Sequence, residues 1–195
     1  MRLLLFLTAI LTISMTVQLI LSSLDSNVYA VTANTTDFSV NVSNNWAYAK
    51  LQLPDAEGSG ILLIPTEFSD SLMNTRDFEK LFQNLSVYST MVIDTSYPFR
   101  NVPLEIYVEH WTNVSSDEFR TWPTWFNQNI TIDGEKALKI NLIIEDEAKA
   151  TDMYLGYYVF HDGIPYRLEY YASVKDFGKY LPQFEQMVKT FVFVK

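Results

Sequence analysis

The sequence predicts an α+β fold in which an antiparallel sheet of about six or seven strands carries helices on its faces. Apolar residues alternate with a period of two in several segments, most clearly over 138–144 and 166–172. Near the end of the chain the apolar spacing changes to three and four residues, as in an amphipathic helix. Helical segments fall between and after the strands at irregular intervals, which disfavours a doubly wound parallel sheet.

The first strands are expected soon after residue 34. Phe38, Val40 and Val42 alternate with polar residues, as in a strand with one buried face. The segments 46–51 and 60–68 are mainly apolar, and a run rich in Gly, Asp and Ser joins them. These two segments are therefore predicted to be consecutive strands.

Two helices and a strand are expected in the middle of the chain. Residues 74–88 place their large apolar side chains on one helical stripe, and residues 104–112 are typical of a strand. A second helix is expected from Ser115, which precedes Glu118 by three residues as in a capping box. Pro123 is expected to end that helix.

Three long strands and a closing helix are expected in the last third of the chain. The strands cover 136–146, 152–162 and 165–172, and the Asp162-Gly163 pair predicts a tight hairpin between the last two. The closing helix is expected to begin near Leu181, with Pro182 tolerated in its first turn. Its buried stripe would contain Leu181, Phe184, Met187, Val188 and Phe191.

Length, composition and charge limit the class of protein. The 195 residues are 48% hydrophobic and 15% aromatic, which suits one globular domain plus an N-terminal addition. The net charge of −9 and the absence of a basic cluster argue against a nucleic-acid partner. An acidic surface also has no attraction for anionic lipids, so membrane contact would require hydrophobic anchoring or another protein.

The N-terminal residues have the pattern of an export signal or of a membrane anchor. After Arg2 the chain is mostly apolar to about Leu24, and small residues then occur in the order of a cleavage site. The pattern favours a signal peptide over residues 1–30, cut after Ala30 or Ala33. An uncleaved anchor is the alternative, because the run approaches the roughly 18 to 20 residues that can span a bilayer. Either way the folded domain, 34–195, lies outside the cytoplasm and is secreted or held at the cell membrane.

Two further features agree with an extracytoplasmic protein. The chain has no cysteine, so it has neither disulfides nor thiolate metal sites, and its core alone must stabilise it. It has five Asn-x-Ser/Thr sequons, which are candidate glycosylation sites. They are Asn34, Asn41, Asn84, Asn113 and Asn129.

No arrangement of residues predicts a catalytic or cofactor-binding site. The two histidines, His110 and His161, lie in no zinc-binding motif, and the sequence contains no Gly-x-Ser-x-Gly elbow. The Gly58-Ser59-Gly60 turn is too short to cradle phosphate. His161, directly before the hairpin turn, is expected to bond to backbone or water.

One acidic run offers the oxygen ligands that calcium accepts. Its spacing is not that of an EF-hand, and Lys149 places a positive charge inside it. A solvated hairpin loop with at most weak calcium binding is expected. The weak candidates are Glu145, Asp146, Glu147 and Asp152.

Tryptophans concentrate in one segment. Trp111, Trp122 and Trp125 are three of the four in the chain, and they surround the helix break expected at Pro123. Most of the aromatic residues there would pack against the sheet, but so many around a break can hardly all point inward. These three tryptophans are therefore the candidates for contact with a protein partner.

The order of packing motifs resembles the PsbP-like family. The opening strand and turn to Trp46 resemble the start of that family, and residues 130–144 resemble its middle segment. The hairpin, the Tyr-rich strand and the Leu181-Pro182 helix start resemble its ending. The resemblance covers about Phe38 to Val194, and the secretory leader and sequons are similar to those of archaeal exported members.

The resemblance implies an α/β/α sandwich around a central antiparallel sheet. The best-known member of the family is an extrinsic subunit of photosystem II that supports calcium and chloride retention without catalysing a reaction. We therefore expect a non-catalytic, extracytoplasmic accessory module that docks on a protein of a membrane-associated complex or on a surface component. The alternatives are an enzyme with a carboxylate-based site and a weak calcium-binding protein.

Overall fold

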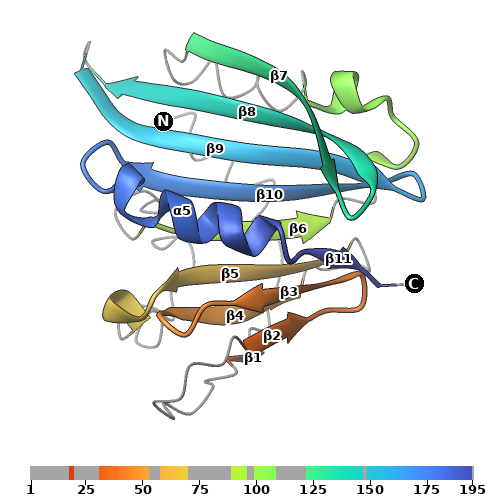
Figure 1. Ribbon diagram of the computed structural model, residues 1–195, viewed down its shortest axis with the longest axis horizontal. Helices are drawn as coiled ribbons and strands as arrows, with labels where there is room; N and C mark the ends of the chain where they lie inside the picture. The colour runs from red at the N-terminus through yellow and green to blue at the C-terminus, as the bar shows by residue number, and fades with distance from the viewer. Residues whose placement is uncertain are drawn as a thin grey trace.

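A large antiparallel sheet forms the body of the protein (Figure 1). The computed structural model describes residues 18–19, 31–52, 58–69, 89–95, 99–108, 122–146 and 149–194. Within these ranges the strands of the large sheet are, in spatial order, β1 (Gln18–Leu19), β4 (Trp46–Gln52), β5 (Ser59–Pro65), β6 (Met91–Thr95), β10 (Ile164–Ser173), β9 (Lys149–His161), β8 (Glu135–Asp146) and β7 (Trp122–Ile132). Every neighbouring pair is antiparallel, and without the two-residue β1 the sheet has the size that the sequence predicts.

Asp-Gly pairs form two of the hairpin turns. Asp162 and Gly163 have φ values of 50° and 76°, and Asp133 and Gly134 have 47° and 88°. Positive φ at both central residues matches the right-handed twist of the flanking strands, and Gly adopts it without steric cost. The prediction of a hairpin at Asp162-Gly163 is confirmed.

One face of the large sheet is covered by a helix and by a second sheet (Figure 1). The helix is α5 (Phe177–Val188), and the second sheet has the order β11 (Val192–Phe193), β3 (Phe38–Val42) and β2 (Val31–Asn34). Phe38 of β3 stacks on Phe191 with ring centroids 5.3 Å apart, and Phe184 of α5 is 1% exposed. Aromatic burial is the largest contribution to this core.

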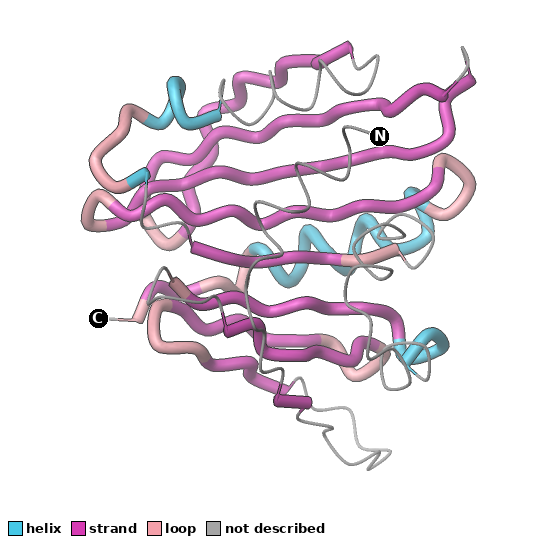
Figure 2. Tube along the Cα trace, turned by 180° about the vertical axis from the view of Figure 1, so that it is seen from behind, coloured by secondary structure: helices cyan, strands magenta, loops and turns pink. Residues whose placement is uncertain are grey.

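Figure 2 shows the large sheet from its opposite face. A smaller apolar cluster lies on that face. A helical turn over residues 104–108 brings Tyr107 and Val108 onto it, both fully buried. Tyr107 packs edge-on against Tyr158 of β9, with ring centroids 6.1 Å apart. Helical segments thus lie on both faces of the sheet, and the α+β prediction is confirmed.

One predicted element of the middle segment is wrong, and one strand there was not predicted. Residues 104–108 are helical, because Pro103 supplies a helix-compatible φ and its carbonyl accepts the Tyr107 N–H at 2.9 Å. Residues 122–132 form β7, a strand that the sequence did not predict, and the helix expected from Ser115 to Pro123 lies almost entirely outside the described residues. β7 is the outermost strand, and edge strands are where sheets accommodate proline.

The terminal helix begins earlier than its apolar stripe predicts. α5 starts at Phe177, so Pro182 lies inside the helix and not in its first turn, and Phe191 follows the helix. Tertiary packing outweighs the one intrahelical bond that Pro182 removes, because Phe177, Tyr180 and Phe184 are all buried. A short 3-10 helix, η2, covers Thr66–Phe68. The predicted helix over 74–88 lies outside the described residues.

Candidate functional site

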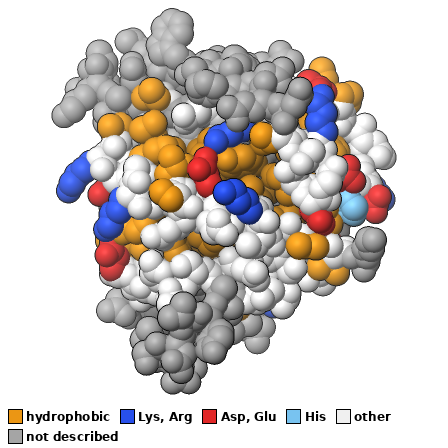
Figure 3. Space-filling model, in the orientation of Figure 1, with side chains coloured by type: hydrophobic (Ala, Val, Ile, Leu, Met, Phe, Trp, Pro, Cys, Tyr) orange, Lys and Arg blue, Asp and Glu red, His pale blue; other side chains and the backbone are white. Residues whose placement is uncertain are grey.

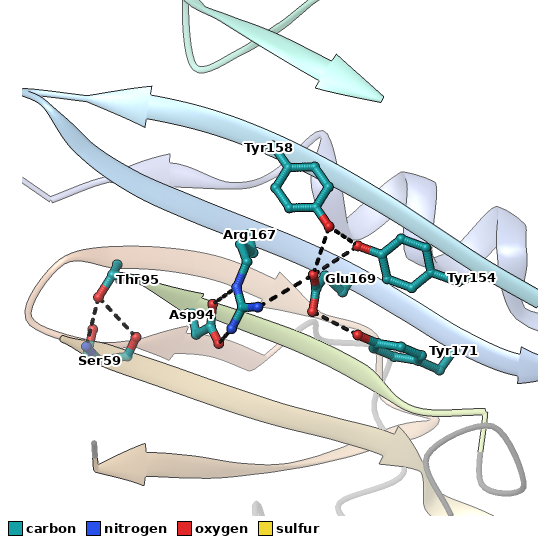
Figure 4. Close-up of polar contacts among 8 residues, drawn as sticks. All are labelled: Ser59, Asp94, Thr95, Tyr154, Tyr158, Arg167, Glu169 and Tyr171. Carbon is teal, nitrogen blue, oxygen red and sulfur yellow. Dashed lines mark hydrogen bonds and ion pairs between the residues drawn. The ribbon is translucent and has the colours of Figure 1, made fainter. Parts of the chain in front are cut away.

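A network of charged and phenolic side chains lies on the face of the large sheet opposite α5 (Figure 4). β10 supplies Arg167 and Glu169. The two side chains share one face of the sheet because residues two apart on a strand point to the same side. β6 supplies Asp94, which is in register with Arg167 although 73 residues separate them. The network therefore joins two strands that the chain brings together from distant segments.

Gly156 makes room for the phenols of this network. It is opposite Glu169 in the register of β9 and β10, between Tyr154 and Tyr158. A Cβ at position 156 would lie 2.2 Å from the Tyr154 hydroxyl and 2.8 Å from the Tyr158 ring. Because Gly156 has no side chain, both phenols can fold over it and reach the carboxylate of Glu169.

Arg167 holds the two carboxylates of the network. Its Nε donates to Oδ1 of Asp94 at 2.8 Å and its Nη2 to Oδ2 at 2.5 Å, which is a bidentate pair. Its Nη1 lies 3.9 Å from Oε1 of Glu169. The side chains of Arg167, Asp94 and Glu169 are only 15%, 9% and 6% exposed. One guanidinium therefore partly neutralises two carboxylates away from water.

Three tyrosines complete the coordination of Glu169. Oε1 lies 2.8 Å from the hydroxyl of Tyr154 and 3.1 Å from that of Tyr158, and Oε2 accepts from Tyr171 at 3.0 Å. The Tyr154 and Tyr158 hydroxyls also contact each other. Since each hydroxyl has one proton, one of that pair donates to Oε1 while the other donates to its neighbour.

Burial sets the ionisation of this network. It raises the pKa of Tyr154, Tyr158 and Tyr171 well above the usual value, and the nearby Glu169 charge adds to this, so the three phenols remain donors. Burial also raises the pKa of Asp94, and Arg167 partly opposes the shift. Burial lowers the pKa of Arg167, but the two carboxylates more than offset it, and the guanidinium stays charged.

Sequence reasoning missed this network. The polar residues between Tyr166, Leu168 and Tyr170 were expected on the outer side of a strand with one buried face, but Glu169 is only 5% exposed. A usable signal is the sequence of β9, where a glycine stands between two tyrosines, followed by a strand with Arg and Glu two apart. A strand with one face in water shows the same alternation, so the pattern alone does not distinguish a solvated polar face from a buried polar network.

Two of the three candidates for partner binding lie on one strand, in register with residues of opposite faces of the sheet. Trp122 and Trp125 both lie on β7, and Trp111 lies outside the described residues. The register pairs Trp122 with Ile143, whose side chain faces the α5 side and is 37% exposed. It pairs Trp125 with Ile140, which belongs to the buried cluster on the opposite face. The two positions are therefore not equivalent.

His161 lies between two carboxylates at the end of β9. Its Nδ1 is 3.2 Å from Oε1 of Glu135 and its Nε2 is 3.6 Å from Oδ2 of Asp162. The ring stacks on Phe193 of β11, with centroids 4.2 Å apart and planes 7° apart. His161 thus contacts side chains, and not only backbone or water as the sequence suggested. His110 lies outside the described residues.

The acidic run forms the tip of the β8–β9 hairpin. Glu145 and Asp146 end β8, Lys149 begins β9, and Asp146 pairs with Lys149 in the register. Glu147 lies outside the described residues, and Asp152 is in register with Ile144. Within the described ranges, no group of three or more His, Cys, Asp or Glu is placed to hold a metal ion.

Calcium binding by this tip is expected to be weak. Calorimetry on the full chain should detect no site tighter than about 10⁻⁴ M, because the run has few ligands and contains a competing lysine. Glu147→Ala is the matched variant, and it should leave the titration unchanged. A micromolar site that Glu147→Ala abolishes would contradict this expectation.

Two of the five sequons lie on one exposed face of the second sheet. Asn34 and Asn41 are exposed on β2 and β3, and Asn41 accepts a hydrogen bond from Thr32 at 2.9 Å. Asn129 lies on β7, and Asn84 and Asn113 lie outside the described residues. Both exposed sequons are reachable by solvent, as a glycosylation site must be.

Comparison with known structures identifies the fold. The solution structure of cyanobacterial PsbP (CyanoP) from Synechocystis sp. PCC 6803 superposes with a TM-score of 0.55 over 90% of this chain and 98% of that chain. The fold is PsbP-like. Sequence identity is 8%, so the likeness concerns the fold alone.

Two further structures are similar over parts of the chain. PA94 from Pseudomonas aeruginosa, a protein of unknown function, has a TM-score of 0.45 at 15% identity over 53% of this chain and 72% of its own. A protein from Bacteroides thetaiotaomicron VPI-5482 has a TM-score of 0.43 at 14% identity over 81% of this chain and 45% of its own. No protein-family model matches the sequence, and no curated protein matches it.

Proposed function

We propose that this protein is a non-catalytic, extracytoplasmic accessory module that docks on a protein partner at the outer surface of a membrane. The observation that carries the proposal is the internal pairing of the buried network. Arg167, Asp94, Glu169 and three tyrosines bond to one another, so the charges of the network are met by other groups of the protein. The PsbP-like fold, whose resemblance implies an accessory role, supports the same conclusion.

The β7 side of the α5 face is the proposed docking surface. Ile143 is 37% exposed there, and Lys139 of β8 pairs with Glu185 of α5 at 2.9 Å. Figure 3 shows apolar side chains across the middle of the α5 face, with acidic and basic side chains among them. A mixture of apolar and charged groups is common in protein interfaces. Trp122 of β7 is in register with Ile143 at this position of the sheet.

The two tryptophan positions on β7 are expected to behave differently. Trp122→Ala should abolish co-purification with the membrane partner and leave the melting temperature nearly unchanged, because its register partner Ile143 is exposed. Trp125→Ala should lower the melting temperature, because its register partner Ile140 is buried. Thermal denaturation and affinity capture from native membranes measure both effects.

Site-directed cross-linking supplies the control. The chain has no cysteine, so Ile143→Cys introduces a single thiol on the proposed surface and Val174→Cys a single thiol at an exposed site in the β10–α5 turn. Only the first should cross-link to a partner. Equal cross-linking from both positions, or unfolding by both tryptophan variants, would contradict the proposed surface.

An enzyme with a carboxylate-based site is the second candidate. The observation in its favour is His161, whose Nδ1 lies 3.2 Å from Glu135. A general base needs one ring nitrogen free for substrate, whereas both nitrogens of His161 face carboxylates and its ring is stacked on Phe193. This arrangement suits the anchoring of β11 better than catalysis.

The N-terminal segment is proposed to direct the domain across a membrane. None of the helices within the described ranges has the length and apolar character to span a bilayer. If the leader stays attached, its apolar run provides the membrane contact. If it is removed, the partner protein alone holds the domain at the surface.

A further inference from the structure

The buried network contains phenols that share one proton acceptor (Figure 4). The hydroxyls of Tyr154 and Tyr158 contact each other, and they lie 2.8 and 3.1 Å from Oε1 of Glu169. Oε2 of the same carboxylate accepts from Tyr171 at 3.0 Å. A carboxylate at these distances is placed to take a proton from a phenol without movement of either side chain.

The charges of the network leave one negative charge in excess. Asp94 and Glu169 carry two negative charges when ionised, and Arg167 carries one positive charge. Asp94 and Glu169 are both buried, so water does little to stabilise the excess charge. Loss of one electron from the network, with all of its protons retained, brings the total charge to zero. The electrostatics of the network therefore favour oxidation of one of its side chains.

We propose that this network is a site of one-electron oxidation, at which one phenol of the Tyr154–Tyr158 pair becomes a persistent phenoxyl radical. The phenol that donates to Glu169 loses one electron to the oxidant, its O–H bond breaks, and the proton bonds to Oε1. The products are a neutral phenoxyl radical and a carboxylic acid, and the oxidant is reduced by one electron. The hydroxyl of the other tyrosine continues to donate to the phenoxyl oxygen.

Burial protects such a radical, and one partly exposed ring connects it to solvent. Tyr154 and Tyr158 are 5% and 2% exposed, which keeps the radical away from a second phenoxyl ring and from dissolved reductants. Tyr171 is half-buried, and its ring centroid lies 4.9 Å from that of Tyr154. Burial raises the pKa of all three tyrosines, so oxidation starts from phenols that hold their protons. The reactant is a small one-electron oxidant, such as the azidyl or carbonate radical, that meets the Tyr171 ring from solution.

Pulse radiolysis of the full chain with azidyl radicals tests the proposal, with phenoxyl radicals detected by their optical and electron paramagnetic resonance spectra. The wild type is expected to retain a phenoxyl signal after that of free tyrosine has decayed. Glu169→Gln keeps the phenols but removes the proton acceptor, and it should lose the persistent signal. Tyr154→Phe combined with Tyr158→Phe keeps the carboxylate and should lose the signal too. Circular dichroism shows which variants are folded, and if one is not, the other decides.

Tyr170→Phe is the matched control. Tyr170 is a fully buried phenol on the same strand as Glu169, but it donates to the backbone carbonyl of Phe177 at 3.0 Å and not to a carboxylate. The control should keep the wild-type signal. A persistent signal in folded Glu169→Gln or in the folded double variant would overturn the proposal. A wild-type radical that decays as fast as that of free tyrosine, or one that Tyr170→Phe removes, would overturn it as well.

Discussion

Replacement of Arg167 by leucine is expected to lower the free energy of unfolding by about 3 to 5 kcal/mol. The variant leaves Asp94 and Glu169 as two buried carboxylates without the guanidinium that holds them. Removing one partner of a buried ion pair costs more than the pair itself contributes, because the remaining charge cannot be solvated. Denaturation with urea, monitored by circular dichroism, measures the loss.

The same variant should show a distinctive pH dependence. Burial raises the pKa of Asp94 and Arg167 lowers it, so removing Arg167 raises it further. In the variant, Asp94 then binds a proton more tightly in the native state than in the unfolded state. Protonation of Asp94 therefore stabilises the folded variant at low pH, and this stabilisation is lost as pH rises through the raised pKa of Asp94. The deficit relative to the wild type should therefore be smaller at about pH 5 than at about pH 8.

An exposed ion pair provides the matched control. Lys136 lies 3.7 Å from Glu105, with side chains 66% and 67% exposed. Lys136→Met should change stability by less than about 1 kcal/mol, because water screens such pairs. If Arg167→Leu cost no more than this control, the network would not be the internally paired centre that the proposed function requires.

Replacement of Phe184 by alanine is expected to cost about 3 to 5 kcal/mol, a large part of the roughly 5 to 15 that stabilises a domain. Phe184 is 1% exposed, and its ring packs against Tyr157 at 5.8 Å and Tyr170 at 5.5 Å between centroids. The cavity left by the ring lies between α5 and the sheet. Urea denaturation is again the measurement.

Val174→Ala is the control for this variant. Val174 is 44% exposed, so its truncation should change stability by no more than about 0.5 kcal/mol. A similarly small effect of Phe184→Ala would show that α5 does not close the sheet. The observed burial of Phe177, Tyr180 and Met187 on the same helix argues for the larger effect.

Predictions from the sequence succeeded where the residues of a single segment are enough to indicate its secondary structure. The alternation over 138–144 and the Asp162-Gly163 turn depend on local backbone geometry, and both elements are present as expected. They failed at residues 104–108, where a short aromatic run suits a helix and a strand equally well, and they did not identify the strand over 122–132. There the position of Pro103 before a buried helical turn, and of Pro123 on an edge strand, decided the outcome.

The sequence by itself determined the alternation of β8 and β10, the Asp162-Gly163 hairpin and most of the apolar stripe of α5, because these depend on neighbours within one segment. Only the tertiary structure decided that β11 pairs with β3 and that Asp94 meets Arg167 across 73 residues. It also decided that Glu169 is buried and not solvated. Alternation states which residues share a face, but whether that face meets water depends on what the rest of the chain places over it.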